Sequence, residues 1–338
     1  KEDMNSAIAE LKSQLDTVKA DNSDVKVSGE LRVAYTKNVQ NYTAMKNNFD
    51  VTRAYLTFKK KLGWDAAVRV TLDVSRLSPT TTTPQTLFDY IKYAYVDLPI
   101  DIPASLQIIP ITLTGKIGLQ HNVWIDWADK IWENAYIMKQ FDDNEGIMSS
   151  ADFGLGAAGK FTLFSLPEIE YHATVFNGTG YKATETNSDK DIALRLNTNL
   201  YSDENIGTVV AGTYLNMKNA LFNTAAQTKQ AALLLAFKNE TYGNVYAEYM
   251  KGTKINGLSI GGFVYPVPSI LPGVGLVARV DSYDPNNTVT TSNDISRSLI
   301  GAFYNWGKDV KIAADLQTSK TGSGAETKIA YMHTVVTF

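Results

Sequence analysis

The sequence contains no cysteine, which excludes disulfides, thiolate metal sites and cysteine nucleophiles. No apolar run approaches the roughly 18 residues that a membrane-spanning helix needs. The net charge is −3, so the chain lacks the basic excess that is typical of nucleic-acid-binding proteins. Only helices and closed barrels satisfy their backbone polar groups in lipid. If this chain spans a membrane, it must therefore do so as a closed β-barrel.

The first segment, 1–24, differs from the rest of the chain. Its apolar residues are spaced by four and three positions, as in a short heptad seam: Met4, Ile8, Leu11, Leu15 and Val18. The pattern predicts an amphipathic helix that can self-associate, followed by a polar linker. A frayed helix or a disordered terminus is the alternative, because about two heptads are marginal alone. We expect residues 1–24 to form one unit and residues 25–338 another.

From Val25 onward the hydrophobic period changes from a helical one to two, the alternation of half-polar β-strands. Each alternating segment is close to the roughly 9–11 residues that cross a bilayer at a tilt. The predicted segments are 25–36, 49–60, 62–75, 86–97, 111–121, 151–164, 167–177, 189–201, 206–217, 228–240, 242–251, 257–266, 273–284, 294–306, 308–319 and 327–338. The pattern predicts an all-β fold, a 16-stranded antiparallel transmembrane barrel.

The connections between these segments alternate in length. Those after even-numbered segments are mostly tight, and those after odd-numbered segments are mostly longer and polar, with 98–110 and 252–256 as exceptions. Short turns on one side and long loops on the other are typical of outer-membrane barrels. An even number of strands places both termini on the short-turn side. We therefore expect the outer membrane as the location, with the N-terminal helix in the periplasm.

The longest connection, 122–150, follows the fifth segment and is too apolar to be disordered, with Trp124, Trp127 and Trp132 among its residues. A short helix is predicted within 126–136. The loop also carries a set of charged residues: Asp126, Asp129, Lys130, Glu133, Asp142, Asp143 and Glu145. We interpret it as a loop that folds into the barrel and narrows a pore. An extracellular lid, or a loop packed between subunits, is the alternative.

Charged residues on the polar face of several segments are expected to point inward. The ones that we assign to the wall of the lumen are Arg32, Arg53, Arg69, Asp73, Arg195, Arg279 and Lys311. Charged side chains lining a pore set its selectivity. An acidic loop opposite a basic wall would create a transverse field. Alternatively, these charges pair within the lumen and only stiffen its wall.

The last predicted strand ends on Phe338. A terminal strand ending in Phe resembles the signal that outer-membrane barrels present to their assembly machinery. Further segments resemble porins of the phosphate-selective type: RAYLTF (53–58) with Asp73, GKIG (115–118), VFNGTG (175–180), DIALR (191–195) and LVARVD (276–281). The resemblance implies a trimeric, 16-stranded barrel. Phosphate-specific members line the pore with a ladder of arginines, which the sequence does not display.

The resulting functional prediction is passive diffusion of small hydrophilic solutes or ions across the outer membrane. We expect outer-membrane lipid, two further copies of the chain and the barrel-assembly machinery as partners, and no cofactor, metal or nucleic acid. The alternative is a structural protein that tethers the membrane to the periplasm through the N-terminal helix. An enzyme is not predicted, because His121, His172 and His333 are scattered and no nucleophile or metalloprotease motif occurs.

Overall fold

The computed structural model describes residues 25–40, 47–76, 87–222, 226–289 and 293–338. The N-terminal segment 1–24, predicted to be a helix, lies outside the described residues. Among the residues that the structure describes, no helix is long and apolar enough to span a membrane.

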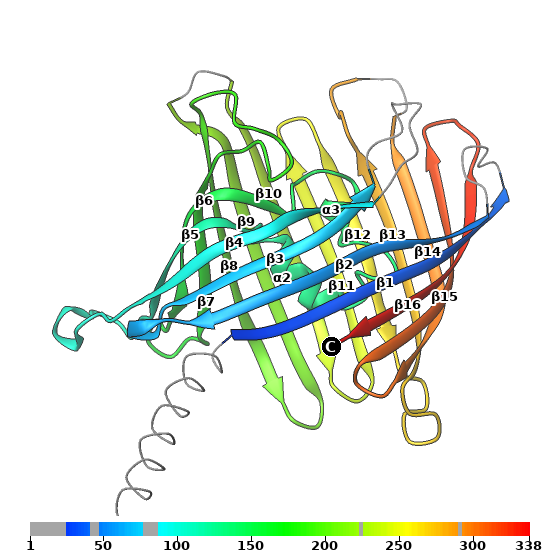
Figure 1. Ribbon diagram of the computed structural model, residues 1–338, viewed down its shortest axis with the longest axis horizontal. Helices are drawn as coiled ribbons and strands as arrows, with labels where there is room; N and C mark the ends of the chain where they lie inside the picture. The colour runs from blue at the N-terminus through cyan, green and yellow to red at the C-terminus, as the bar shows by residue number, and fades with distance from the viewer. Residues whose placement is uncertain (1–24, 41–46, 77–86, 223–225, 290–292) are drawn as a thin grey trace, which may run out of the picture.

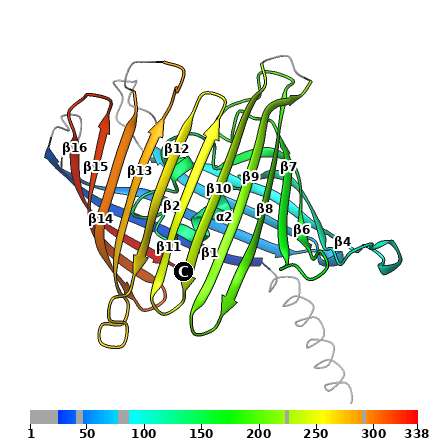
Figure 2. The same ribbon diagram turned by 180° about the vertical axis from the view of Figure 1, so that it is seen from behind.

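Sixteen antiparallel strands form a closed barrel, in which each strand pairs with its neighbours in sequence and β1 closes the ring on β16. Figures 1 and 2 show the barrel from its two sides. The strands are β1 (Val25–Gln40), β2 (Asn48–Lys61), β3 (Ala67–Arg76), β4 (Leu87–Ile100), β5 (Leu113–His121), β6 (Ala151–Phe161), β7 (Ile169–Phe176), β8 (Lys190–Asp203), β9 (Gly207–Leu221), β10 (Thr228–Asn239), β11 (Gly243–Gly252), β12 (Asn256–Val264), β13 (Val274–Asp284), β14 (Ile295–Trp306), β15 (Val310–Thr321) and β16 (Thr327–Thr337). The predicted fold class is confirmed.

The predicted third segment began too early. Residues Gly63–Asp65 form the 3-10 turn η1, in which Trp64 and Asp65 have positive φ values of 57° and 56°. Such left-handed backbone is incompatible with a strand, so β3 begins only at Ala67. A second 3-10 turn, η2 (Ala104–Leu106), lies in the long connection between β4 and β5.

Neighbouring residues along the strands differ in exposure as the alternating pattern predicts. Leu234 is buried while Leu233 is 58% exposed, and Arg279 is buried while Val280 is 54% exposed. The exposed member of each pair is apolar and faces outward, where a lipid phase would cover it. The buried member, apolar in Leu234 and charged in Arg279, faces the interior of the barrel.

Where β1 meets β16, Phe338 is hydrogen-bonded to β1. The amide of Gly29 donates to the carbonyl of Phe338 at 2.7 Å, and the amide of Phe338 donates back to Gly29 at 3.0 Å. A Cβ added at Gly29 would collide with the Phe338 ring. The ring therefore lies directly over this glycine on β1.

Candidate functional site: a loop inside the barrel

The loop 122–150 lies inside the barrel rather than above it. It carries two helices, α2 (Ile125–Trp132) and α3 (Phe141–Asn144), and the views in Figures 1 and 2 both place α2 within the ring of strands. The two ends of the loop meet, because the amide of Asn122 donates to the carbonyl of Ser150 at 3.0 Å. The Asn122 side chain accepts from the amides of Trp124 and Ile125 and so satisfies free N–H groups at the start of α2.

The apolar side of the loop packs against half of the barrel wall. Trp124, Trp132 and Phe141 are each no more than 1% exposed. They form one apolar cluster with inward-facing residues of β8 to β16, among them Ala193, Tyr214, Leu234, Tyr246, Met250, Phe263 and Val277. Gly212 on β9 is required for this contact, because a Cβ there would overlap the Trp127 ring. This half of the lumen is therefore filled by a packed core.

Wall side chains also bind the backbone of the loop. Five of them donate hydrogen bonds to backbone carbonyls of the loop. The donors and their acceptors are Arg195 to Val123 (3.0 Å), Asn244 to Ile131 (2.6 Å), Arg32 to Ala135 (2.9 Å), Gln317 to Ile137 (3.1 Å) and Arg279 to Lys139 (2.5 Å). Three of these donors are arginines that the sequence assigned to the lumen wall. Their guanidinium groups contact the loop carbonyls and hold the loop in place.

Two loop acids bind bases of the wall. Glu145 pairs with Arg297 at 2.5 Å, and Glu133 pairs with Lys238 at 2.9 Å. Sequence reasoning identified the acids but missed both bases. Arg297 lies on β14 two residues before the buried Leu299, so its inward parity was the available signal.

Not every predicted loop acid faces open space. Asp142 is fully buried, and burial raises the pKa of its carboxyl group. Asp143 pairs with Lys139 within the loop at 3.6 Å. Asp142, Asp143 and Glu145 contribute to neither of the cavities described next. Glu145 contacts Arg297 on β14, and Gln140 joins Asp142 to Glu248 on β11. A role of Asp142, Asp143 and Glu145 in a constriction stays a prediction.

Two adjoining cavities lie between the loop and the barrel wall. One, of about 300 Å³, lies toward the short-turn end, where Lys308, Asp309 and Thr337 border it. The other, of about 370 Å³, lies toward the long-loop end, where Thr36 and Asn48 border it. Arg32, Ala135 and Tyr136 line both cavities. Both cavities therefore border β1, β15, β16 and the loop, on the side of the barrel away from β8 to β13.

The two cavities differ in charge. The short-turn cavity is bordered by the acids Glu30, Asp126, Asp129, Glu133 and Asp309 and by the bases Arg32, Lys130, Lys308 and Lys311. The long-loop cavity is bordered by Arg32, Arg53 and Lys139 and by the single acid Asp50. Four of the predicted loop residues, Asp126, Asp129, Lys130 and Glu133, thus face a cavity.

The acids of α2 differ in their protonation. Burial raises the pKa of Asp129 to about 7, and the neighbouring Asp143 carboxylate adds to this effect. Burial acts in the same direction on Asp126, but the ammonium of Lys130, 2.8 Å away, helps to lower the pKa of that carboxyl to about 2. Asp126 is therefore ionised at neutral pH, whereas Asp129 titrates there.

Several wall charges pair with each other, as the alternative interpretation predicted. Arg32 contacts Glu30 at 2.6 Å, Arg279 contacts Asp281 at 2.7 Å, and Arg53 lies 3.4 Å from Asp73. Three bases, Arg53 again among them, lie over aromatic rings. The guanidinium groups of Arg53 and Arg69 lie over Tyr55 and Tyr93, and the Lys311 ammonium lies over Tyr136. The wall charges are thus held in fixed positions.

Sequence reasoning missed the residues at which the cavities meet. Ala135 and Tyr136 are uncharged, so their residue types did not mark them as lining a route for solutes. Glu248, a buried acid on β11 that faces Asp142, was also missed. Its inward parity with Tyr246 and Met250 was visible, but its partner could not be known from the sequence.

The sequence matches no model of a known protein family and no curated protein. Solved structures of bacterial outer-membrane proteins do match. Pseudomonas putida OprB at high pH aligns with a TM-score of 0.69 at 10% identity, covering 95% of this chain and 96% of that one. The outer-membrane channel DcaP of Acinetobacter baumannii aligns at 0.58 and 13% identity, covering 93% and 97%.

An anion-selective porin from Comamonas acidovorans aligns with a TM-score of 0.57 at 10% identity, covering 93% of this chain and 99% of that one. Likeness at this level of identity concerns the fold. The predicted resemblance to porins is confirmed for the fold, whereas the phosphate-selective type stays a prediction. The chain has the 16-stranded barrel fold of the bacterial outer-membrane porins.

Proposed function

We propose that the chain is an outer-membrane porin through which small hydrophilic solutes and ions diffuse passively. The observation that carries this proposal is the pair of cavities that adjoin at Arg32, Ala135 and Tyr136, with one cavity toward each end of the barrel. The apolar side of the loop packs against β8 to β13, away from these cavities. We infer a polar route bordered by β1, β2, β15, β16 and the loop.

The charges along this route would set its selectivity. The loop contributes Asp126, Asp129, Lys130 and Glu133, and the wall contributes Arg32, Arg53 and Lys311. Because charged side chains at a constriction act on passing ions at short range, we infer that these residues discriminate between solutes. The remaining wall bases Arg195 and Arg279 act through the loop, whose carbonyls they bind.

The location and the partners follow from the same proposal. The outward apolar residues of the strands suit outer-membrane lipid, and the short turns would face the periplasm. A homotrimer and a periplasmic helix over 1–24 belong to this proposal.

Tethering through that helix depends on residues outside the described part, and no observation in the described residues favours it. The proposal involves no covalent chemistry and no cofactor.

Swelling of proteoliposomes tests the proposal. Liposomes that contain the folded barrel should swell in isotonic solutions of small sugars and amino acids, at rates that fall as the solute becomes larger. Protein-free liposomes are the control. Swelling no faster than this control, with a barrel shown to be folded by its circular dichroism, would refute the porin proposal.

A further inference from the structure

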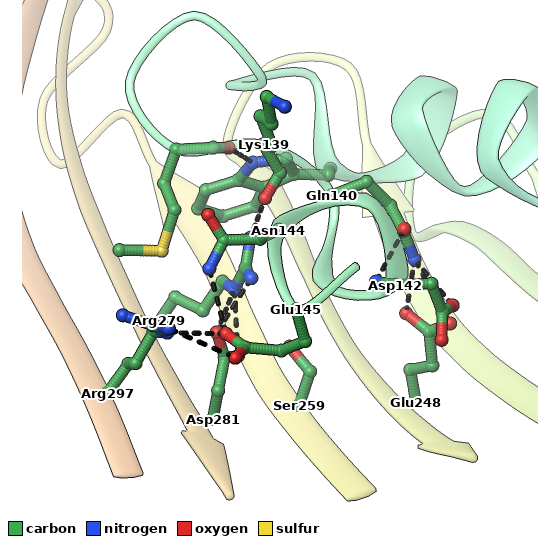
Figure 3. A network of polar contacts seen from close by, with 12 residues as sticks. Lys139, Gln140, Asp142, Asn144, Glu145, Glu248, Ser259, Arg279, Asp281 and Arg297 are labelled. Carbon is green, nitrogen blue, oxygen red and sulfur yellow. Dashed lines mark hydrogen bonds and ion pairs between the residues drawn. The ribbon is translucent and has the colours of Figure 1, made fainter. Parts of the chain in front are cut away.

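Two carboxyl groups meet where the loop touches β11. Glu248 on β11 is 1% exposed and Asp142 on α3 is 0% exposed. The side-chain amide of Gln140 lies between them and donates to Asp142 Oδ2 at 3.1 Å and to Glu248 Oε1 and Oε2 at 3.1 and 3.0 Å. Figure 3 shows this amide between the two acids. One amide thus bridges the loop acid and the wall acid.

Both sides of this contact have further hydrogen bonds. The indole Nε1 of Trp124 donates to Glu248 Oε1 at 2.5 Å, which adds a second bond from the loop to the same wall acid. The side-chain oxygen of Gln140 accepts from the amides of Asp142 and Asp143 and so caps α3. Glu248 therefore holds the start of the loop, through Trp124, and its later part, through Gln140.

This pair has no basic partner in direct contact among the residues that the structure describes. Within the described part of the chain, neither Asp142 nor Glu248 forms an ion pair. The other titratable groups that face the pair come from β9, β11, β13 and the loop, and are Tyr214, Tyr246, Arg279, Asp281, Tyr283 and Glu145.

Arg279 is the single base in that set, and it is engaged elsewhere. Its guanidinium binds Asp281 at 2.7 Å, donates to the carbonyl of Lys139 and lies over the Trp132 ring. Glu145 is bound to Arg297, as Figure 3 also shows. The two buried acids are thus left facing each other.

Two carboxyl groups that share a buried site cannot both be ionised at low cost, so such a pair keeps one proton between them. Asp142 Oδ1 has no hydrogen-bond partner among the described residues and is an available position for that proton. Burial also raises the pKa of Asp142.

We propose that Glu248 is the positioning residue of the loop: it shares one proton with Asp142, and loss of that proton at alkaline pH releases the α3 segment from the wall and changes the width of the pore. The inference rests on the proposed porin function. It adds to that function a pH-dependent control of the pore width. The two acids that carry this control, Glu248 and Asp142, border neither cavity.

The position of α3 links the pair to the route. Met138, Lys139 and Asn144 border the long-loop cavity, and they flank Gln140 and Asp142 on both sides in the chain. A displacement of α3 would therefore move part of the cavity lining. The ion pair of Glu145 with Arg297 and the bond of Arg279 to Lys139 would keep the loop in the lumen. The expected result is a change in conductance and not loss of the barrel.

The experiment combines two measurements on the full chain in detergent or lipid. The first is the infrared C=O stretch of a protonated carboxyl group, recorded at about pH 8 so that Asp129 is mostly ionised. The second is single-channel conductance from about pH 6 to about pH 10. Glu248→Gln and Asp142→Asn keep the side-chain volume and remove one acid each.

Glu170→Gln is the matched control, because Glu170 is a wall acid on β7 that binds Asn197 and Lys160 and borders neither cavity. We expect the carboxyl band in the wild type and in Glu170→Gln, and its loss in Glu248→Gln and in Asp142→Asn. We also expect a conductance step at alkaline pH, above the titration of Asp129, in the first two proteins and no such alkaline step in the other two.

The possible results distinguish a failure of the shared-proton proposal from a failure of the porin proposal on which it rests. Absence of the band from the wild type, or an unchanged alkaline step in both Glu248→Gln and Asp142→Asn, would overturn the shared proton as the control of the loop. If none of the folded proteins conducts at any pH, the porin proposal fails, while the infrared band still decides whether the proton is shared.

Discussion

The guanidinium of Arg32 on β1 donates from Nη1 to the carbonyl oxygen of Ala135 at 2.9 Å, across 103 residues of sequence. The same guanidinium donates from Nε to Glu30 Oε1 at 2.6 Å. Arg32 borders both cavities, and so does Ala135. One side chain therefore anchors the loop and also places a positive charge where the two halves of the route meet.

Arg32→Gln should shift the selectivity of the pore toward cations. A unit charge about 4 Å away in a watery environment contributes about 1 kcal/mol, which corresponds to a permeability ratio that changes on the order of fivefold. The reversal potential across a salt gradient in a planar bilayer measures that ratio. Lys160→Gln is the control, because Lys160 lies outside both cavities, in surface ion pairs with Glu168 and Glu170. Equal reversal potentials in Arg32→Gln and the wild type would contradict the assigned route.

The selectivity should also depend on pH near neutrality through Asp129. The pKa of this carboxyl is raised to about 7, so Asp129 gains a proton as the pH falls through that value. The short-turn cavity then loses one negative charge, and the preference for anions should increase. Reversal potentials recorded between about pH 5 and about pH 9 measure the shift. Asp129→Asn should remove it. A shift that persists unchanged in this variant would assign the titration to another group.

Gly212→Ala should disturb the packing of the loop. The added Cβ would overlap the Trp127 ring, and overpacking of this kind typically costs about 1–3 kcal/mol. The free energy of unfolding in detergent, followed by tryptophan fluorescence, measures the loss. Gly63→Ala is the control, since a Cβ at Gly63 has no atom within 4 Å. Equal unfolding free energies of the two variants would show that Trp127 does not pack tightly against β9.

Phe338→Ala should lower the amount of barrel that is assembled in the outer membrane of cells. The Phe338 side chain is 71% exposed, so its removal should change the unfolding free energy of the refolded protein by no more than about 0.5 kcal/mol. Quantifying the folded barrel in isolated membranes, beside refolding in detergent, separates the two effects. Normal assembly in cells would refute the role of Phe338 as an assembly signal.

The barrel was predictable because its pattern is local. Alternation along each strand fixed the inward orientation of Arg32, Arg195 and Arg279, and the length and aromatic content of 122–150 indicated a loop with a specific position. The partners of the loop were not predictable. Glu248 lies more than a hundred residues from Asp142 and Trp124, and only the closed barrel brings them together. The same holds for Glu145 and Arg297.

Single-channel conductance in a planar bilayer reports the width of the route and tests the central claim most directly. Since Asn122 and Ser150 are hydrogen-bonded at 3.0 Å, residues 123–149 can be replaced by a short glycine-rich turn without stretching β5 or β6. We predict discrete current steps for the wild type, in groups of three if the protein is a trimer, and larger steps for the variant. Steps of equal size in the two proteins, or a folded wild-type barrel without current, would contradict the conclusion that this loop narrows a pore.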